Sequence, residues 1–365
     1  MAAKSVVSPL ARYRQLAPSA SVFVSPLSLG SMNFGHLHQP MLGECTKETA
    51  FEILDHYFDQ GGNFIDTANA YQGGETEKWL GEWMAARKNR DQIVLATKYT
   101  GMYKGLEPDL KIKSNYGGNG AKSMKLSLND SLQKLQTDYV DILYVHWWNY
   151  TTTIPDSPAW VVAKANQYAR DHGLRQFVVY QGQWSAALRD MEREIVPMCR
   201  DEGMGMCIWG VLNQGRFQTE AAFREREENH EGRNHGPVSE RDRQVSKVLE
   251  NLADAKGVTV TNVALAYIMQ KEPYVFPIVG GRKLEHIKGN IDGLSVALTG
   301  EEVVRIDSAY MFDPGFPHIF LSGSVLKGTD APQKNASRPS EVWLTTFQGT
   351  LDWVEAPQAI RPAPS

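Results

Sequence analysis

Short apolar runs alternate along the chain with longer segments in which apolar residues recur at helical spacing. The short runs are rich in β-branched and aromatic residues, as buried strands are, and lie at 28–32, 63–67, 93–97, 141–146, 177–181, 206–210 and 275–280. The longer segments have the period of amphipathic helices and lie at 46–62, 75–88, 121–139, 157–173, 189–203, 241–257, 261–271, 282–293 and 299–310. This alternation predicts a parallel sheet covered by helices.

The alternation runs without a linker to Tyr310 and predicts one α/β domain. We expect a (β/α)8 barrel of the TIM type over residues 1–310, opening with a hairpin at about 11–30. Between the strand at 206–210 and the helix at 241–257 we expect a charged loop. Residues 311–365 are rich in Pro and predict an extended tail, whose apolar start, 311–321, would fold over the barrel mouth.

Composition excludes several classes of protein. Of 365 residues, 42% are hydrophobic and 22% charged, and the net charge is -4 without a long basic run, so neither nucleic acid nor an anionic membrane is expected as a partner. No apolar run is long enough to cross a bilayer. Three Cys fit a reducing, cytoplasmic location, and neither they nor the His residues have zinc-site spacing, so no metal is expected. Nothing specifies the oligomeric state.

Ionisable residues stand at the ends of successive predicted strands or in the loops that follow. They are Asp66, Tyr71, Lys98 and His146. Each alone has an ordinary structural explanation, as a turn cap, a packed aromatic, a solvated cation or a core histidine. Because the carboxyl ends of barrel strands converge, however, we expect the four side chains to meet.

Together these four residue types predict a proton-transfer site. A tyrosine hydroxyl has an ordinary pKa of about 10, and a neighbouring ammonium group favours its phenolate form and lowers that value. Lys98 supplies the ammonium group, Asp66 pairs with it, and His146 orients a carbonyl oxygen opposite Tyr71. This arrangement suits the reduction of a C=O bond by a hydride, with Tyr71 giving the proton.

The chain resembles the aldo-keto reductase superfamily, and most closely its fungal aryl-alcohol dehydrogenase and norsolorinic-acid-reductase-like branch. The resemblance spans about residues 22–310 and rests on "GGNFIDTANAY", "LATKY", "LQTDYVDILYVHW" and "PIVGGRKLEHIKGNI". It implies that Tyr71 is the proton donor, that Lys98 lowers its pKa, that Asp66 completes the site and that His146 contacts the substrate carbonyl. It also implies NADP(H) as the cofactor and a small carbonyl or alcohol as the substrate, in secondary metabolism.

The cofactor would bind without a Rossmann fold, and the chain indeed has no Gly-x-Gly-x-x-Gly loop after a strand. Arg282 and Lys283 at a helix start form a plausible anion site from the residues alone, although a solvated helix start is the alternative. The resemblance assigns the cofactor to Asp66, Asp156, Gln181, Trp209, Gly210, Val211, Leu212, Gly215, Arg216, Arg282, His286 and Asn290. The spacing of Tyr267 and Lys271, found also in short-chain dehydrogenases, we attribute to chance.

The sequence departs from the superfamily at one place. Only seven strands can be counted where the family barrel has eight, and "WWNYTTTIP" leads from the His146 strand directly into the helix at 157–173. The fourth helix and the fifth strand, roughly 20 residues at ordinary element lengths, are therefore missing. Asp156 keeps a cofactor-contacting position of the family, whereas Pro155 replaces its serine. We expect an open or distorted barrel with weakened cofactor binding.

Two functions follow from these features. The intact set of four ionisable residues favours an NADPH-dependent reductase or dehydrogenase of aldehydes, ketones or aryl alcohols. The missing strand favours a catalytically impaired protein that binds a cofactor or a partner, as the potassium-channel β subunits of the superfamily do. The substrate itself cannot be read from the loops.

Overall fold

A computed structural model describes residues 7–150, 159–229, 238–327, 336–354 and 356–363. Its main sheet has seven parallel strands in the order β6-β5-β4-β3-β9-β8-β7. The strands are β3 (Ser28–Gly30), β4 (Phe64–Asp66), β5 (Val94–Tyr99), β6 (Ile142–Val145), β7 (Val179–Gln183), β8 (Gly205–Trp209) and β9 (Val275–Val279). Each overlaps one of the seven runs from which a strand was predicted.

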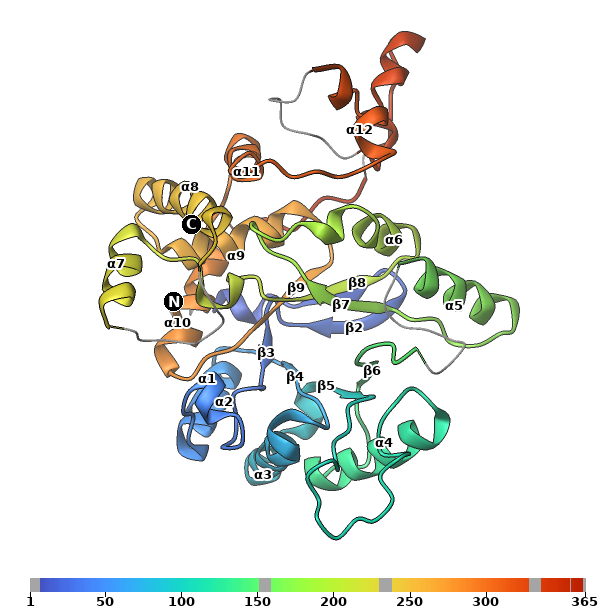
Figure 1. The fold of residues 1–365 in the computed structure, drawn as a ribbon, viewed down its shortest axis with the longest axis vertical. Coiled ribbons are helices and arrows are strands. Elements are labelled where there is room, and N and C mark those ends of the chain that lie inside the picture. Colours follow the sequence, from blue (N-terminus) through green and yellow to red (C-terminus); the bar gives the residue numbers. More distant parts are fainter. Residues whose placement is uncertain (1–6, 151–158, 230–237, 328–335, 355, 364–365) are drawn as a thin grey trace, which may run out of the picture.

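Helices surround the curled sheet (Figure 1). The main ones are α2 (Lys47–Asp59), α3 (Glu75–Arg87), α4 (Ala121–Leu135), α5 (Ala159–Asp171), α6 (Ile195–Asp201), α8 (Glu240–Lys256), α9 (Val260–Lys271), α10 (Leu284–Asp292) and α11 (Gly300–Asp307). Hydroxyl side chains fix where several of them begin. Thr46 accepts a hydrogen bond from the amide of Thr49, and Ser239, Thr259 and Thr299 form capping boxes.

The sheet is an open barrel, because β6 and β7 form its two edges. These are the strands that flank the position of the missing helix and strand. Among the described residues, no further strand joins either edge, and the two edges lie on the same side of the molecule (Figure 1). The expected opening of the barrel is thus confirmed, and a complete eight-stranded barrel is not formed. We call the space between β6 and β7 the seam.

The two faces of the sheet pack into separate apolar clusters. The outer face packs against the helices in the large cluster, to which Leu29, Ile65, Leu95 and Ile208 belong. The inner face forms a smaller cluster of Leu16, Val24, Phe64, Ala96, Tyr144, Cys207 and Phe276. Side chains alternate between the faces of a strand, which is why neighbours such as Phe64 and Ile65 enter different clusters.

An N-terminal hairpin closes the amino-terminal end of the open barrel. Its strands β1 (Arg14–Ala17) and β2 (Ala20–Val24) are antiparallel and lie within the predicted hairpin range of 11–30. Leu16 and Val24 reach into the inner cluster. The backbone of the hairpin also approaches the start of β8 closely, since a Cβ on Gly205 would lie 2.1 Å from the carbonyl oxygen of Leu16.

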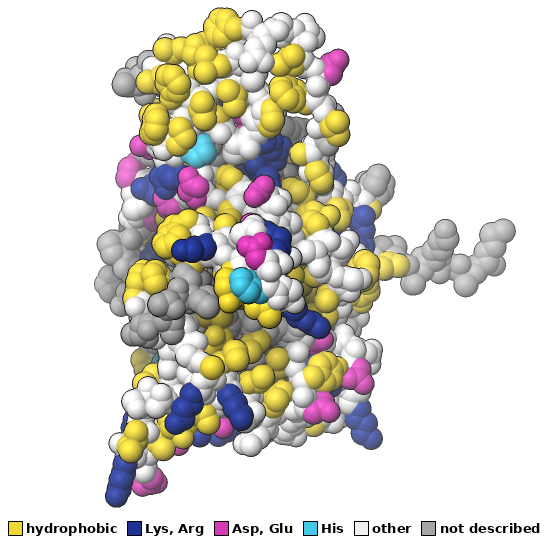
Figure 2. Space-filling view, turned by 90° about the vertical axis from the view of Figure 1, so that its right-hand side faces the viewer, with side chains coloured by type: hydrophobic (Ala, Val, Ile, Leu, Met, Phe, Trp, Pro, Cys, Tyr) yellow, Lys and Arg dark blue, Asp and Glu magenta, His cyan; other side chains and the backbone are white. Residues whose placement is uncertain are grey.

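Two segments differ from the sequence prediction. The expected charged loop contains helix α7 (Glu220–Asn229), whose residues are mostly good helix formers. The tail, which includes α12 (His318–Leu321), does not cover the mouth of the barrel but runs along the outside of α6 and α9 (Figure 1). Its contacts include the ring of Phe312, 4.6 Å from the Arg189 guanidinium, and a hydrogen bond from Arg361 to the carbonyl of Leu298. Many apolar side chains of its projecting part are exposed (Figure 2).

The Tyr-x-x-x-Lys pair lies in a buried ionic cluster outside the barrel. Lys271 Nζ is 2.7 Å from Tyr267 Oη and pairs with Glu192 and Asp307, and Arg189 also pairs with Glu192. Two cations and two anions balance here, so the charges can be buried together. The cluster links the segment after β7 to α9 and α11, which supports a structural explanation of the Tyr267 and Lys271 spacing.

The packing of α3 on α4 gives a test of the fold. A Cβ on Gly81 would lie 2.2 Å from the carbonyl oxygen of Lys134, so Gly81→Ala should lower the free energy of unfolding by about 1–3 kcal/mol. Gly300→Ala, where no atom lies within 4 Å of the added carbon, should change it by less than about 0.5 kcal/mol. Urea unfolding measures both. Equal stabilities of the two variants would contradict the described approach of α3 to α4.

Candidate active site

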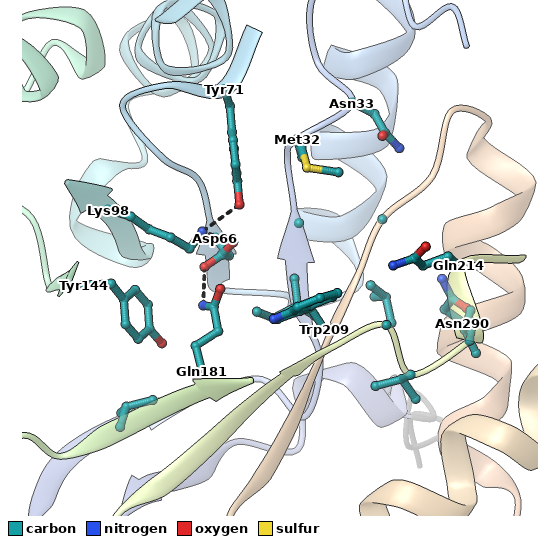
Figure 3. Close-up of a pocket in the computed structure, with 18 of the residues that line it drawn as sticks. Met32, Asn33, Asp66, Tyr71, Lys98, Tyr144, Gln181, Trp209, Gln214 and Asn290 are labelled. Atoms are coloured by element: carbon teal, nitrogen blue, oxygen red, sulfur yellow. Dashed lines mark hydrogen bonds and ion pairs between the residues drawn. The ribbon is translucent and has the colours of Figure 1, made fainter. Parts of the chain in front are cut away.

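Strand register brings the predicted catalytic residues to one face. Asp66 ends β4 and pairs with Ala96 of β5, and Lys98 lies two residues further along β5, opposite Tyr144 of β6. Residues two apart point to the same face of a strand, so Asp66, Lys98 and His146, the residue after β6, all face the inside of the barrel. The close-up in Figure 3 shows Asp66 and Lys98 meeting there.

A fixed loop places Tyr71 over these residues. The loop follows β4, and its backbone is held to β5 by a hydrogen bond from the Asn69 amide to the Lys98 carbonyl. Gln72 has a left-handed backbone (φ 52°), and its side chain bonds to the Met32 carbonyl and the His38 amide. These bonds hold the turn that aims the Tyr71 hydroxyl at Lys98.

A buried hydrogen-bond network joins four of the predicted residues. Lys98 Nζ donates to Asp66 Oδ2 at 2.6 Å, to Tyr71 Oη at 3.0 Å and to the Thr67 carbonyl at 2.7 Å. Gln181 Nε2 donates to the other carboxylate oxygen of Asp66 at 2.9 Å (Figure 3). The ammonium group thus has three acceptors, and its side chain is 1% exposed. Full hydrogen bonding is what allows such a charge to be buried.

Burial and neighbouring charges shift the pKa values of Lys98 and Tyr71 in opposite directions. Burial lowers the pKa of Lys98, but the charges of Asp66 and Tyr71 outweigh it and hold the pKa above its usual value. Burial raises the pKa of Tyr71, and the attraction of Lys98 offsets only part of this rise. The pKa of Tyr71 therefore lies above its usual value, in contrast to the expected lowering, because desolvation of the phenolate is the larger effect.

His146 lies beside these residues as a neutral imidazole. Its ring meets that of Tyr71 edge-on, with the centroids 5.9 Å apart. Burial, aided by the positive charge of Lys98, lowers the pKa of His146 to about 3. Its Nδ1 is buried and has no hydrogen-bond partner among the described residues. A neutral ring beside a protonated phenol leaves the two side chains free to bind one oxygen atom between them.

One cavity of about 1130 Å³ connects these residues with most of the predicted cofactor positions. Asp66, Gln181, Trp209, Gly210, Val211, Leu212, Gly215, Arg282, His286 and Asn290 all line it. Arg216 does not line it, and Asp156 lies outside the described residues. The described part of the tail also contributes no residue to the lining, in contrast to the expected fold of the tail over the mouth.

The lining has the chemistry that a nicotinamide dinucleotide needs. The indole of Trp209 is 40% exposed and projects into the cavity, where it offers a flat surface for stacking (Figure 3). Arg282 stands before α10, with its guanidinium over Gly43, where a Cβ would lie 1.9 Å from Nη1. A cation beside a helix N-terminus suits a phosphate. Asn290 and Gln214 lie at this end of the cavity (Figure 3).

Several lining residues escaped the sequence prediction. They include Met32, Asn33, Tyr144, Thr259 and Thr261. Met32 and Asn33 follow β3, so the rule of strand ends could have found them. Thr259 and Thr261 stand at the start of α9, a position that only the folded chain brings to the cavity. Among the described residues, no group of three or more His, Cys, Asp or Glu is arranged to hold a metal ion, and no helix is long and apolar enough to span a membrane.

Comparison with curated proteins finds relatives that match almost the whole chain. A norsolorinic acid reductase B of Dothistroma septosporum is 60% identical over 372 aligned positions, which cover 96% of this chain and 94% of the relative. An aryl-alcohol dehydrogenase of Pestalotiopsis microspora is 48% identical, with 97% and 94% covered. The aryl-alcohol dehydrogenase (NADP(+)) of Phanerodontia chrysosporium is 44% identical, with 86% and 89% covered.

The alignments also bear on the missing segment. The alignment with the Dothistroma protein is longer than the 365-residue chain, so that relative has residues without a counterpart here. The profile of the aldo/keto reductase family matches in two pieces, residues 26–160 and 156–311, which meet where the strand and helix are missing. The two pieces cover most of the chain. With its four converging ionisable residues and these relatives, the chain belongs to the aldo/keto reductase family of oxidoreductases.

Proposed function

We propose that the protein is an NADPH-dependent reductase that interconverts an aryl or polycyclic carbonyl compound and its alcohol, in fungal secondary metabolism. The observation that carries the proposal is the position of Lys98 Nζ, 2.6 Å from Asp66 and 3.0 Å from Tyr71 Oη, beside the ring of His146. The printed names of the relatives, norsolorinic acid reductase and aryl-alcohol dehydrogenase (NADP(+)), support the substrate and cofactor classes.

The chain's residues divide the work between binding and proton transfer. Trp209 and Gln181 would hold the nicotinamide end of the cofactor, and Arg282, His286 and Asn290 would hold its adenosine phosphate. When bound, NADPH supplies the hydride. The hydroxyl of Tyr71 and the neutral ring of His146 orient the substrate's carbonyl oxygen between them. Tyr71 Oη gives its proton to that oxygen as the alcohol forms, and the Lys98 ammonium stabilises the resulting phenolate.

The open sheet supports a second candidate, a catalytically impaired protein that binds a cofactor or a partner. β6 carries His146 toward the site and β7 carries Gln181, and both are edge strands. Edge strands are less constrained than interior ones, so the geometry of the two residues is less firmly held. NADPH binding with ordinary micromolar affinity, together with efficient reduction of aryl aldehydes, would contradict this second candidate.

Replacing the proton donor separates the two candidates. Tyr71→Phe removes the donated proton and should lower kcat for aryl aldehyde reduction by about 10²–10⁴-fold, while NADPH binding is unchanged. Loss of NADPH absorbance measures turnover, and quenching of tryptophan fluorescence measures binding. Tyr13→Phe, at a half-exposed tyrosine of the N-terminal segment, is the matched control and should keep full activity. Equal turnover of the two variants would exclude Tyr71 as the donor.

The dependence of the rate on pH follows from the two pKa shifts. The pKa of Tyr71 lies above its ordinary value of 10.0, so the phenol persists at neutral pH. The pKa of His146 is about 3, so its ring is neutral throughout. Carbonyl reduction should therefore be flat between about pH 6 and 9, whereas alcohol oxidation, which needs the phenolate, should rise about tenfold per pH unit. Stopped-flow single-turnover rates in both directions test this prediction. A pH profile with its midpoint near pH 7, for either the reduction or the oxidation rate, would contradict it.

The proposed phosphate contact predicts a change in cofactor preference. Arg282→Ala removes a charged donor and should weaken NADPH binding about 10–100-fold, with little effect on NADH, which lacks the adenosine phosphate. Arg305→Ala, at an exposed position of α11, is the matched control and should change neither affinity. Fluorescence titration of the two variants with both cofactors gives the dissociation constants. Equal weakening of NADPH and NADH would place Arg282 elsewhere on the cofactor.

A further inference from the structure

The catalytic cavity continues into the seam between β6 and β7. Besides Tyr71 and His146, its lining includes Ile142 of β6, Val179 of β7, Phe177 just before β7, and Val162 of α5. These residues lie toward the starts of the two edge strands and beyond them, away from the carboxyl ends where Asp66 and Lys98 meet. The cavity therefore reaches the side of the barrel as well as its mouth.

The seam exposes side chains that belong to the barrel interior. Ile142 and Val179 face inward and pack against the inner cluster, but they are only partly buried. Phe64, Cys207 and Phe276 in the same cluster, on strands with neighbours on both sides, are at most 1% exposed. Val94 of β5 and Ile278 of β9, which have neighbouring strands on both sides, are also partly buried in this cluster, but only Ile142 and Val179 lie on the two edges that flank the seam. Figure 2 views the molecule from this side, and apolar side chains are exposed across the middle of the face.

We propose that the seam is an extension of the substrate site, which takes the distal apolar rings of an extended aromatic carbonyl compound while the carbonyl group lies between Tyr71 and His146. The inference rests on the proposed reductase function. Two observations favour a substrate over another occupant of the seam. The apolar walls of Ile142 and Val179 are continuous with the catalytic cavity, and the nearby charges of Asp66 and Lys98 are already paired with each other.

The proposal gives the open barrel a consequence for specificity. In a closed barrel, side chains fill the interior below the strand ends, and a substrate enters only from the mouth. Here, a rigid polycyclic compound gains apolar contacts along the seam that a single-ring aldehyde is too short to make. The preference for the extended compound should therefore depend on the seam, and the rate with a compact aldehyde should not.

Filling the seam tests this dependence. Val179→Trp places a large side chain in the seam and should lower kcat/KM for 1-pyrenecarboxaldehyde about tenfold or more, while kcat/KM for benzaldehyde stays within about twofold. Val304→Trp makes the same change at an exposed position of α11, where Val304 is 61% exposed, and should alter neither value. Circular dichroism and thermal unfolding of both variants establish that they are folded. If Val179→Trp changes kcat/KM equally for the two aldehydes, or changes it for neither, the proposal is overturned.

Binding without turnover gives an independent measurement. The wild-type protein should bind 1-pyrenemethanol without a cofactor, as followed by pyrene fluorescence, and Val179→Trp should weaken this binding about tenfold. If the wild-type protein reduces neither aldehyde, the proposed function fails, yet this titration still tests the seam. Unchanged pyrene binding in Val179→Trp would overturn the proposal, as would a wild-type dimer that the substitution dissociates, because the seam would then be a surface for self-association.

Discussion

The buried ammonium group of Lys98 is the constraint on which the candidate active site depends. A charge that is 1% exposed must be fully hydrogen-bonded, and its three acceptors are Asp66, Tyr71 and the carbonyl of Thr67. The hydrogen bonds of this ammonium group fix the end of β4 and the loop that carries Tyr71. The second oxygen of Asp66 then holds Gln181, which ties the far edge of the sheet to the same network. One desolvated charge thus sets the geometry of residues from three strands and a loop.

The opening of the sheet reduces the restraint on two site residues, and the hydrogen-bond network increases it. His146 and Gln181 belong to the two edges, where the sheet gives each strand only one neighbour. The hydrogen bond from Gln181 to Asp66 and the edge-on contact of His146 with Tyr71 restore part of the restraint that a missing strand would have given. The site is therefore assembled by side-chain contacts across the barrel interior as much as by the sheet. The same opening leaves Ile142 and Val179 accessible from the cavity.

Much of this arrangement could be predicted from the local pattern. All seven strands, the nine main helices and the hairpin are governed by periodicity and capping residues, which act over a few positions. The convergence of Asp66, Lys98 and His146 followed from their places at strand ends, because parallel strands in register carry such residues to one edge. The missing strand could also be predicted, because only seven strands can be counted in the sequence.

Other features depended on contacts between distant segments. Helix α7 lay within what reads as a charged loop. The tail packs on α6 and α9 because Ser337 bonds to Arg200 of α6 and Arg361 bonds to Gln270 of α9, contacts that no local pattern reveals. The net rise of the Tyr71 pKa required the balance between burial and the charge of Lys98, and burial is a property of the folded molecule alone. The sequence by itself determined which ionisable groups the strand ends bring together and where a strand is lacking. Only the tertiary structure decided how deeply those groups are buried and what the opening exposes, since desolvation is set by all the segments that surround a side chain.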